Sequence, residues 1–350
     1  MTSRPLVARI SSDALTHNLA VARRLAAGAK VMAIIKADGY GHGLEHTAQA
    51  LWAADGFGVL SLDEAIRLRD QGWTRPILLL EGFFDAEELP AFFEHGLTPV
   101  IHSSEQIAML EAACAIRRLP VFLKINTGMN RLGIDPAGVS AAVARLGACA
   151  EVTLMTHFAC ADDATGIESQ LHAFQAATAG YELPVSLANS AALIRFREAR
   201  RGWVRPGIML YGVSPVAGMN IGLRPAMTLA SRIITVRKLK AGAGVGYGAT
   251  FVADRDMRIG VVACGYADGY PRHAGTGTPI LVGGRRTRTL GRVSMDMLIA
   301  DISDLVDAGV GTEVVLWGDG LPVEEVAAAA DTISYELLTA RAARVPVVVA

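Results

Sequence analysis

The chain has 350 residues, and its 33 lysines and arginines against 34 aspartates and glutamates leave a formal charge of −1. Hydrophobic residues make up 51% of the chain and charged residues 19%, a composition that excludes a disordered protein. A nearly neutral chain has no net positive charge to attract nucleic acid or an anionic membrane, so neither is an expected partner. The length of the chain indicates about two domains.

Short apolar runs alternate with segments of helical period over the first two thirds of the chain. The stretch 13–26 has leucines at helical spacing and predicts an amphipathic helix before the first strand. Ser61 and Glu64 have the spacing of a capping box, and further helices are predicted to start at Ser103 and at Asp135. The predicted strands are Val31–Ile35, Phe57–Leu60, Pro76–Leu80, Leu97–Ile101, Pro120–Ile125, Val152–Phe158, Leu183–Ala188 and Val204–Leu210.

Eight such strands separated by helices favour an α/β fold with a closed (β/α)8 TIM-type barrel over a doubly wound open sheet. The active groups of such barrels lie at the carboxyl ends of the strands. The predicted strand ends carry a polar set of the kind that this requires: Lys36, Lys124, Asn126, His157, Asn189, Ser190 and Arg205.

After residue 223 the pattern changes to strands joined by glycine-rich turns. The predicted elements are strands over Met227–Leu239, Arg258–Cys264, Thr278–Val282, Thr287–Ile302 and Glu313–Trp317, and helices over Val323–Ala330 and near Tyr335. We therefore expect a barrel over 10–223 and a β-rich C-terminal domain over 224–350. Residues 1–9 could add a strand to the second domain through Leu6–Ile10.

Membrane, secretion and metal signals are weak in this sequence. No stretch approaches the roughly 18 uninterrupted apolar residues that span a bilayer, and short runs such as Val345–Val349 suit buried strands. Arg4 and Arg9 interrupt the segment where the apolar core of a secretory signal would lie. The four cysteines have no C-x-x-C spacing, which favours reduced thiols in a cytoplasmic protein over a metal site or disulfides: Cys114, Cys149, Cys160 and Cys264.

Lys36 leaves an apolar strand for a glycine-rich turn, in the string AIIKADGYGHG. Partial desolvation at such a place lowers the pKa of an amine and frees it as a nucleophile, which suits Schiff-base chemistry. Glycines 39, 41 and 43 let the backbone approach a bulky ligand, and Tyr40 can present a hydroxyl to it. From this string alone, a lysine that only caps the strand is the more ordinary interpretation.

The same string resembles the pyridoxal-phosphate attachment motif of the alanine racemases. Further blocks resemble those of that family, in its order: KINTGMNRLG (124–133), MTHFACAD (155–162), LANSAA (187–192), VRPGIMLYG (204–212), VGYGATF (245–251), GYADGYPR (265–272), GRVSMDM (291–297) and TISYELLTARAARVP (332–346). The resemblance covers nearly the whole chain. It implies a fold-type III racemase that uses pyridoxal 5′-phosphate to interconvert L-alanine and D-alanine.

The resemblance assigns Lys36 to covalent attachment of the cofactor and pairs it with Tyr247 as the two catalytic bases. Racemisation removes a proton from one face of Cα and delivers one to the other, so two acid–base groups on opposite faces make chemical sense. Tyr247 would come from the second subunit of a homodimer. Met295 and Asp296 would come from that subunit to the substrate, and Tyr266 would narrow the entrance.

The resemblance also implies the cofactor contacts. Arg205 would face the pyridine nitrogen, and because a guanidinium does not readily give up a proton, that nitrogen would stay largely unprotonated. His157 would lie against the cofactor ring. The other cofactor-binding residues, most of them for the phosphate, would be Tyr40, Asn189, Ser190, Gly207, Ile208 and Tyr335.

Arg131 matches the residue that steers the substrate carboxylate, for which a planar bidentate donor is suited. Lys124 matches a lysine that is carbamylated in many members of the family, where the new carboxylate braces that arginine. Ser186 departs from the family pattern, because many relatives have a histidine there that supports the ring-nitrogen arginine. The departure predicts a weaker or water-mediated support of Arg205, and the divergent C-terminal end RVPVVVA changes the contacts expected at the dimer edge.

Three alternatives to a dedicated alanine racemase stay open at this point. One is a racemase of broader range, for example one that also accepts serine. A non-catalytic pyridoxal-phosphate carrier is another, although a carrier needs neither the second domain nor an opposing base such as Tyr247. The third is an aldolase that uses the lysine without a cofactor. A racemase would supply D-alanine for peptidoglycan precursors or act in D-alanine catabolism.

Overall fold

The computed structural model describes residues 4–113 and 118–349, so that Cys114 lies outside the described residues. The chain forms two compact units. One, here called the barrel unit, comprises Leu15–Gly39 and Leu44–Leu223. The other, the β unit, comprises the residues up to Ala14, the short segment Tyr40–Gly43, and the chain from Arg224 onward. Among the residues described, no helix is both long enough and apolar enough to cross a bilayer.

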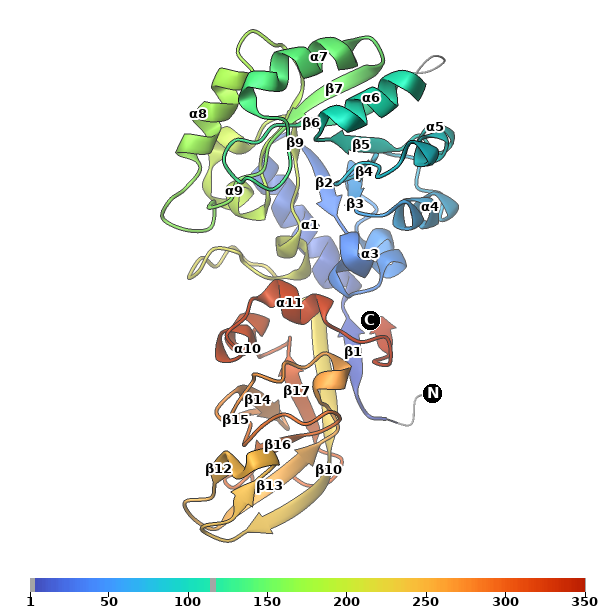
Figure 1. The fold of residues 1–350 in the computed structure, drawn as a ribbon. Helices are drawn as coiled ribbons and strands as arrows, with labels where there is room; N and C mark the ends of the chain where they lie inside the picture. Colours follow the sequence, from blue (N-terminus) through green and yellow to red (C-terminus); the bar gives the residue numbers. More distant parts are fainter. Residues whose placement is uncertain (1–3, 114–117, 350) are drawn as a thin grey trace. The chain divides into compact units, whose positions relative to one another are not determined.

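Within the described residues of the barrel unit, eight parallel strands pair in chain order and close into a barrel, with β9 returning to β2. Helices α4 to α8 lie outside the strands (Figure 1). The closed ring confirms the barrel and excludes the doubly wound sheet. The strands are β2 (Lys30–Ile34), β3 (Gly56–Val59), β4 (Ile77–Leu79), β5 (Thr98–Ile101), β6 (Leu119–Lys124), β7 (Ala150–Met155), β8 (Val185–Ser186) and β9 (Trp203–Val204).

The helices of this part begin close to where the sequence predicts them. Ser61 caps α4: its Oγ accepts from the Glu64 amide at 3.2 Å, and the Glu64 carboxylate accepts from the Ser61 amide at 3.5 Å, which completes the capping box. The α-helices are α1 (Ser12–Ala26), α3 (Leu44–Ala50), α4 (Leu62–Asp70), α5 (Leu89–His95), α6 (Ser104–Ala113), α7 (Val139–Gly147), α8 (Glu168–Ala177) and α9 (Ser190–Arg195).

The strand predicted over Val204–Leu210 is wrong for most of its length. β9 ends at Val204, and a 3-10 turn, η4 (Ile208–Tyr211), follows instead. All four residues of η4 are buried. A short apolar run indicates that the segment is buried, but it does not distinguish a strand from a buried helical turn.

The β unit is a mixed sheet built around the long strand β10 (Met227–Leu239), with strand order β15-β14-β17-β10-β1-β18. Beyond a register shift between Ile233 and Thr235, β10 pairs with β13, which in turn pairs with β16. The other strands are β1 (Val7–Ile10), β11 (Gly244–Val245), β12 (Phe251–Val252), β13 (Met257–Val262), β14 (Pro279–Val282), β15 (Arg285–Arg288), β16 (Leu298–Asp301), β17 (Glu313–Trp317) and β18 (Val347–Val349).

Several expectations for this unit are confirmed and two are wrong. The N-terminal segment does add a strand, β1, and helices α10 (Val323–Ala329) and α11 (Ser334–Thr339) lie where predicted. The single strand expected over Thr287–Ile302 is instead two strands, β15 and β16, separated by a loop that contains Gly291 with φ +68°. β18 is not buried, since Val348 is 51% exposed at the edge of the sheet.

Candidate active site

Lys36 stands at the carboxyl end of β2 and begins an unusual left-handed turn, α2 (Lys36–Tyr40). Ala37, Asp38 and Gly39 have φ between 53° and 62°, and Tyr40 has φ 52°. Left-handed backbone costs roughly 1–2 kcal/mol for each residue that carries a side chain, so the surroundings must hold this turn in place.

Two carboxylates hold that turn. Asp38 Oδ1 accepts from the Leu44 amide at 2.9 Å, and Glu64 Oε1 accepts from the Asp38 amide at 3.2 Å. The other oxygen of Glu64 accepts from the Leu60 amide at 3.0 Å. The residue that completes the cap of α4 therefore also fixes the backbone just after Lys36, a role that its capping-box spacing alone did not reveal.

Cationic side chains gather around Lys36 at this end of the barrel. Burial lowers the pKa of Lys36, and the charge of Arg131 lowers it further, while Glu81 and Glu64 act in the opposite direction. Lys124, at the end of β6, is buried, and burial together with nearby Arg205 lowers its pKa to about 8. Glu81 follows β4 and was missed at the sequence level, although its position after a strand end marks it.

Arg131 lies in the loop after β6 and is exposed. Asn126 braces this loop, because its Oδ1 accepts from the amides of Gly128 at 3.2 Å and Asn130 at 3.0 Å. Within the part of the chain that the structure describes, Arg131 makes no hydrogen bond or ion pair of its own. Its guanidinium therefore stays available to an anionic ligand.

Arg205 follows β9 and is buried, with its guanidinium held by neighbouring strand ends. It donates to Ser186 Oγ at 2.6 Å and to the Thr156 carbonyl at 2.7 Å, and Ser186 Oγ in turn donates to the Trp203 carbonyl at 3.0 Å. The expectation of a water-mediated contact is thus wrong, because the serine hydroxyl reaches the guanidinium directly. Burial lowers the pKa of Arg205 to about 10, which leaves it charged at neutral pH.

His157 lies two residues beyond β7, with its Nδ1 3.4 Å from Arg205 Nη2. Burial lowers the pKa of His157 well below its ordinary value, and the charge of Arg205 lowers it further. The imidazole is therefore neutral at physiological pH, which suits a flat ring packed against another ring better than it suits a cation.

Ser190 and Gly207 come together at the ends of the last two barrel strands. The Gly207 amide donates to Ser190 Oγ at 2.8 Å. Asn189 caps α9 by accepting from the Ala192 amide at 2.9 Å, and Ile208 opens η4 directly after Gly207. Barrels of this type often bind phosphate at this place, and hydroxyl and amide groups are the donors that a phosphate needs.

Tyr40 and Tyr335 meet within the β unit, where their ring centroids lie 6.2 Å apart. Burial raises the pKa of Tyr40, and Tyr335 raises it further, so its hydroxyl stays protonated and can donate. Gly41 beside it cannot carry a side chain, because a Cβ there would lie 2.1 Å from the Leu338 carbonyl oxygen. Arg341 Nε donates to the Gly41 carbonyl at 2.7 Å, which adds a second tie to this segment.

The remaining predicted residues of the β unit project from its surface. Tyr247 is 70% exposed in the turn η5 (Tyr247–Ala249), and Met295 is 54% exposed. Tyr266, in the turn η6 (Tyr266–Asp268), is 38% exposed. The amide of Tyr266 donates to the Ser294 carbonyl at 3.0 Å, so the turn that carries Tyr266 and the loop that carries Met295 and Asp296 lie side by side.

Two family models and several known proteins match this architecture. The family model described as "Alanine racemase, N-terminal domain" matches residues 10–215, and that described as "Alanine racemase, C-terminal domain" matches residues 226–349. The alanine racemase of Nitrosospira multiformis is 56% identical over 351 residues, which cover 98% of both chains. That of Thiobacillus denitrificans is 59% identical over 350 residues, which cover 98% of this chain and 95% of the relative.

Solved structures of alanine racemases have the same fold as this chain. The biosynthetic alanine racemase of Pseudomonas aeruginosa has a TM-score of 0.96 at 47% identity, over 99% of each chain. The alanine racemase of Bartonella henselae, solved with covalently bound pyridoxal phosphate, has a TM-score of 0.92 at 29% identity, also over 99% of each chain.

A (β/α)8 barrel with a desolvated lysine at a strand end, followed by a β-rich domain, defines here an isomerase of the amino-acid racemase class. The chain belongs to the alanine racemase family, whose enzymes interconvert L-alanine and D-alanine. The resemblance, the fold class and the racemase activity expected from the sequence are thereby confirmed, and the aldolase and carrier alternatives are set aside.

Proposed function

We propose that this racemase carries pyridoxal 5′-phosphate on Lys36 and uses Lys36 and Tyr247 as its two bases. The observation that carries the proposal is the partial burial of Lys36 at the end of β2, which lowers the pKa of its amine beside Arg131. A deprotonated amine is the form that attacks an aldehyde and that accepts a proton. When bound, the cofactor supplies the electron sink that lets a proton leave Cα.

The residues of the barrel unit fit such a group. The Gly207 amide donates to Ser190 Oγ at 2.8 Å, which orients the serine and leaves its hydroxyl hydrogen to donate to a phosphate. Arg205 stays charged at neutral pH and would leave a facing ring nitrogen without a proton, which limits side reactions. His157 offers a neutral flat ring. In the barrel unit, the proposed cofactor-binding residues are Asn189, Ser190, Gly207 and Ile208 together with these two ring contacts. Tyr40 and Tyr335, which belong to the β unit, complete the proposed set.

The proton on the opposite face of Cα would be handled by Tyr247 of a second copy of the chain, in a homodimer. The exposure of Tyr247 and of Met295 supports this, since large side chains that protrude into water are typical of surfaces that another protein covers. Met295, Asp296 and Tyr266 would then line the substrate side and keep the entrance narrow.

Arg131 would bind the substrate carboxylate with its unpaired guanidinium. Carbamylation of Lys124 would brace it, because the new carboxylate is a natural partner for an arginine. The lowered pKa of Lys124, about 8, supports this modification: about a tenth of the amine is neutral at pH 7, and only the neutral amine reacts with carbon dioxide.

The proposed division of labour places cofactor binding in a domain over 10–223 and the partner-facing residues in a domain over 224–350. We further propose a cytoplasmic enzyme that supplies D-alanine for peptidoglycan or serves D-alanine catabolism. A racemase of broader substrate range, which accepts serine as well, is the second candidate.

Borohydride reduction of the purified protein, followed by peptide mass spectrometry, tests the cofactor proposal without relying on activity. A pyridoxyl-phosphate mass on the Lys36 peptide is the expected result, and it should persist in Lys124→Met but not in Lys36→Ala. A label on another lysine, or none at all, would contradict the assignment. Racemisation assays with alanine, serine and larger amino acids then test the substrate, and comparable rates for all of them would remove the preference for alanine.

A further inference from the structure

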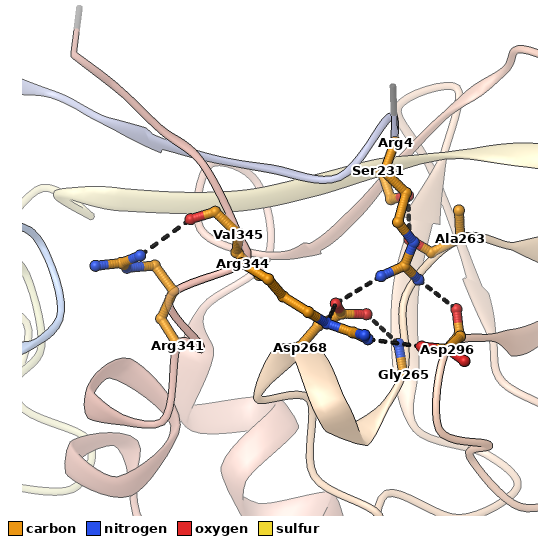
Figure 2. Close-up of polar contacts among 9 residues, drawn as sticks. All are labelled: Arg4, Ser231, Ala263, Gly265, Asp268, Asp296, Arg341, Arg344 and Val345. Atoms are coloured by element: carbon orange, nitrogen blue, oxygen red, sulfur yellow. Dashed lines mark hydrogen bonds and ion pairs between the residues drawn. The ribbon is translucent and has the colours of Figure 1, made fainter. Parts of the chain in front are cut away.

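Two arginines from distant parts of the sequence meet on one buried carboxylate in the β unit (Figure 2). Asp268 has no exposed side-chain surface, and its Oδ1 accepts from Arg4 Nη1 and from Arg344 Nε, each at 2.7 Å. Its Oδ2 accepts from the Gly265 amide at 2.9 Å. One oxygen of this carboxylate is therefore held by two residues far away in the chain, and the other by the local turn.

Both arginines also reach a second segment. Arg4 Nη2 donates to the backbone carbonyl of Asp296, and Arg344 Nη2 donates to Asp296 Oδ1 at 2.8 Å (Figure 2). We call these four residues the Asp268 cluster: Arg4, Asp268, Asp296 and Arg344. Through it, the turn that carries Tyr266 is joined to the loop that carries Met295.

The backbones of these two segments are in direct contact as well. The Tyr266 amide donates to the Ser294 carbonyl and the Ala267 amide donates to the Met295 carbonyl, each at 3.0 Å. Gly265 lies so close that an added Cβ would meet the Ser294 carbonyl oxygen at 2.3 Å. The two segments are thus packed at backbone distance and cannot separate without breaking these bonds.

The side chains that this arrangement carries are partly exposed. Met295 and Tyr266 are 54% and 38% exposed, so the backbone beneath them has a large part in fixing their positions. Asp268 is shielded from solvent, and salt bridges to a shielded carboxylate are screened less than surface pairs. The Arg344–Asp296 pair, in contrast, has both side chains over 40% exposed, where an ion pair adds little stability, so its main effect is on orientation.

We infer that Arg4, Asp268 and Arg344 are positioning residues for the substrate side of the reaction. They fix the backbone from which Tyr266, Met295 and Asp296 project, and thereby set the width of the pocket and its preference for alanine over the larger serine. This inference rests on the proposed function, in which those three side chains line the partner subunit's site. Arg4, Asp268 and Arg344 themselves take no part in proton transfer.

The test uses the dimeric holoenzyme and compares Arg344→Ala with Arg286→Ala. Arg286 is a matched control, because it forms an exposed ion pair with Glu325 in the same unit, away from the cluster. We expect Arg344→Ala to lower kcat/KM for L-alanine by about 10-fold to 100-fold, mainly through KM, since small displacements near a site carry such costs. The value for L-serine should fall less, and Arg344→Lys should lie between, while Arg286→Ala keeps wild-type values.

Hydrogen exchange gives a readout that is independent of activity. The Tyr266 and Ala267 amides should exchange faster in Arg344→Ala than in the wild type or in Arg286→Ala, because the loop that accepts their hydrogen bonds is released. A variant that melts at a lower temperature but keeps wild-type exchange at these amides and the wild-type preference for alanine over serine would overturn the inference. Should Arg344→Ala fail to fold, Arg344→Lys decides by the same two readouts.

Failure of the proposed function would look different. It would appear as absence of the cofactor mass on Lys36 in the wild type, or as a full racemisation rate in Tyr247→Phe. The inference itself fails when both of those tests support the proposed function and the Arg344 variants keep the wild-type amide exchange and the wild-type substrate preference.

Discussion

In the barrel unit, Lys124 and Arg205 are 6% and 4% exposed and the charge of one shifts the pKa of the other, whereas in the β unit Tyr247 is 70% exposed. Burial sets the chemistry of Lys124 and Arg205 in the barrel unit. In the β unit, Tyr247 and Met295 instead project into solvent. Under the proposed function, Lys124 and Arg205 are tuned by burial within one chain, whereas Tyr247 and Met295 act once a second copy covers them.

The largest effect is expected at Lys36, on which the proposed function depends. Lys36→Ala should lower racemisation by more than about 10⁴-fold, because the proposed catalytic base and the proposed cofactor link are lost together. The measurement is circular dichroism of L-alanine converting to D-alanine, with visible absorbance of the bound cofactor. Lys30→Ala, at the exposed opposite end of the same strand, is the control and should keep both signals. Comparable activity in the two variants would remove Lys36 from the mechanism.

Mixing two inactive variants tests whether Tyr247 of one subunit serves the active site of the other subunit. In a homodimer of Lys36→Ala or of Tyr247→Phe both sites lack one base, but a mixed dimer contains one site with both. Unfolding and refolding an equal mixture should therefore restore roughly a quarter of wild-type activity, because half of the dimers are mixed and each has one intact site. No recovery, from a mixture shown by mass spectrometry to contain mixed dimers, would place Tyr247 in the same chain as the lysine it serves.

Ser186→Ala probes how the barrel unit holds its buried cation. The change leaves one Arg205 N–H without its acceptor and the Trp203 carbonyl without its donor. It should cost about 3 kcal/mol in the free energy of unfolding, as is usual for a buried charged group that loses its partner. Urea unfolding measures this, with the exposed Ser104→Ala as the matched control. Equal midpoints for the two variants would mean that the serine contact contributes nothing.

The pH dependence of stability should report Lys124. Its pKa is about 8 in the folded protein against an ordinary 10.5, so the unfolded chain binds more protons between these values and stability should rise with pH across that interval. Below pH 8 the full penalty of a buried cation applies. In bicarbonate-free buffer, Lys124→Met should reduce the slope and gain about 3 kcal/mol at pH 7. Identical urea midpoints for variant and wild type at pH 7 and pH 10 would refute this.

Glu64 should give the smallest effect. Glu64→Ala removes the acceptor for the Asp38 amide and should cost about 1 kcal/mol in unfolding free energy. Because the Glu64 carboxylate raises the pKa of Lys36, its loss should also move the acidic limb of the pH–rate profile to lower pH. Glu64→Gln keeps one acceptor but no charge, and its amide nitrogen faces a backbone N–H, so it should recover part of the stability and leave the pH–rate profile shifted. The neighbouring Asp63→Ala is the control, and a shift as large there would assign the effect to general surface charge.

Strand positions in the barrel could be predicted because buried parallel strands are continuous apolar runs. The same rule misled at Val204–Leu210, where the run belongs to a buried 3-10 turn. It gave no sign of β11 and β12, which are too short to form a pattern. In the β unit, β10 and β17 were predicted correctly because strands of that length stand out between glycine-rich turns.

Strand ends also pointed to Lys36, Lys124 and Arg205 as a group, because the topology of a barrel brings such ends together. What the sequence could not predict depends on contacts across long separations. The left-handed turn at Ala37 and Asp38 is held by Glu64, 26 residues beyond Asp38, and although aspartate tolerates such backbone, nothing in Ala37 favours it. The pairing of Arg4 with Asp268 is more distant still, at 264 residues.

One consequence concerns how the chain is made. β1 lies inside the sheet, antiparallel to β10 and parallel to β18, yet it precedes the whole barrel in the sequence. During translation this strand leaves the ribosome first and must wait, unpaired, until both of its neighbours have been synthesised. Pairing of such high contact order is slow and leaves strand edges open to other chains meanwhile. The β unit should therefore be the late-folding and aggregation-prone half of a nascent chain.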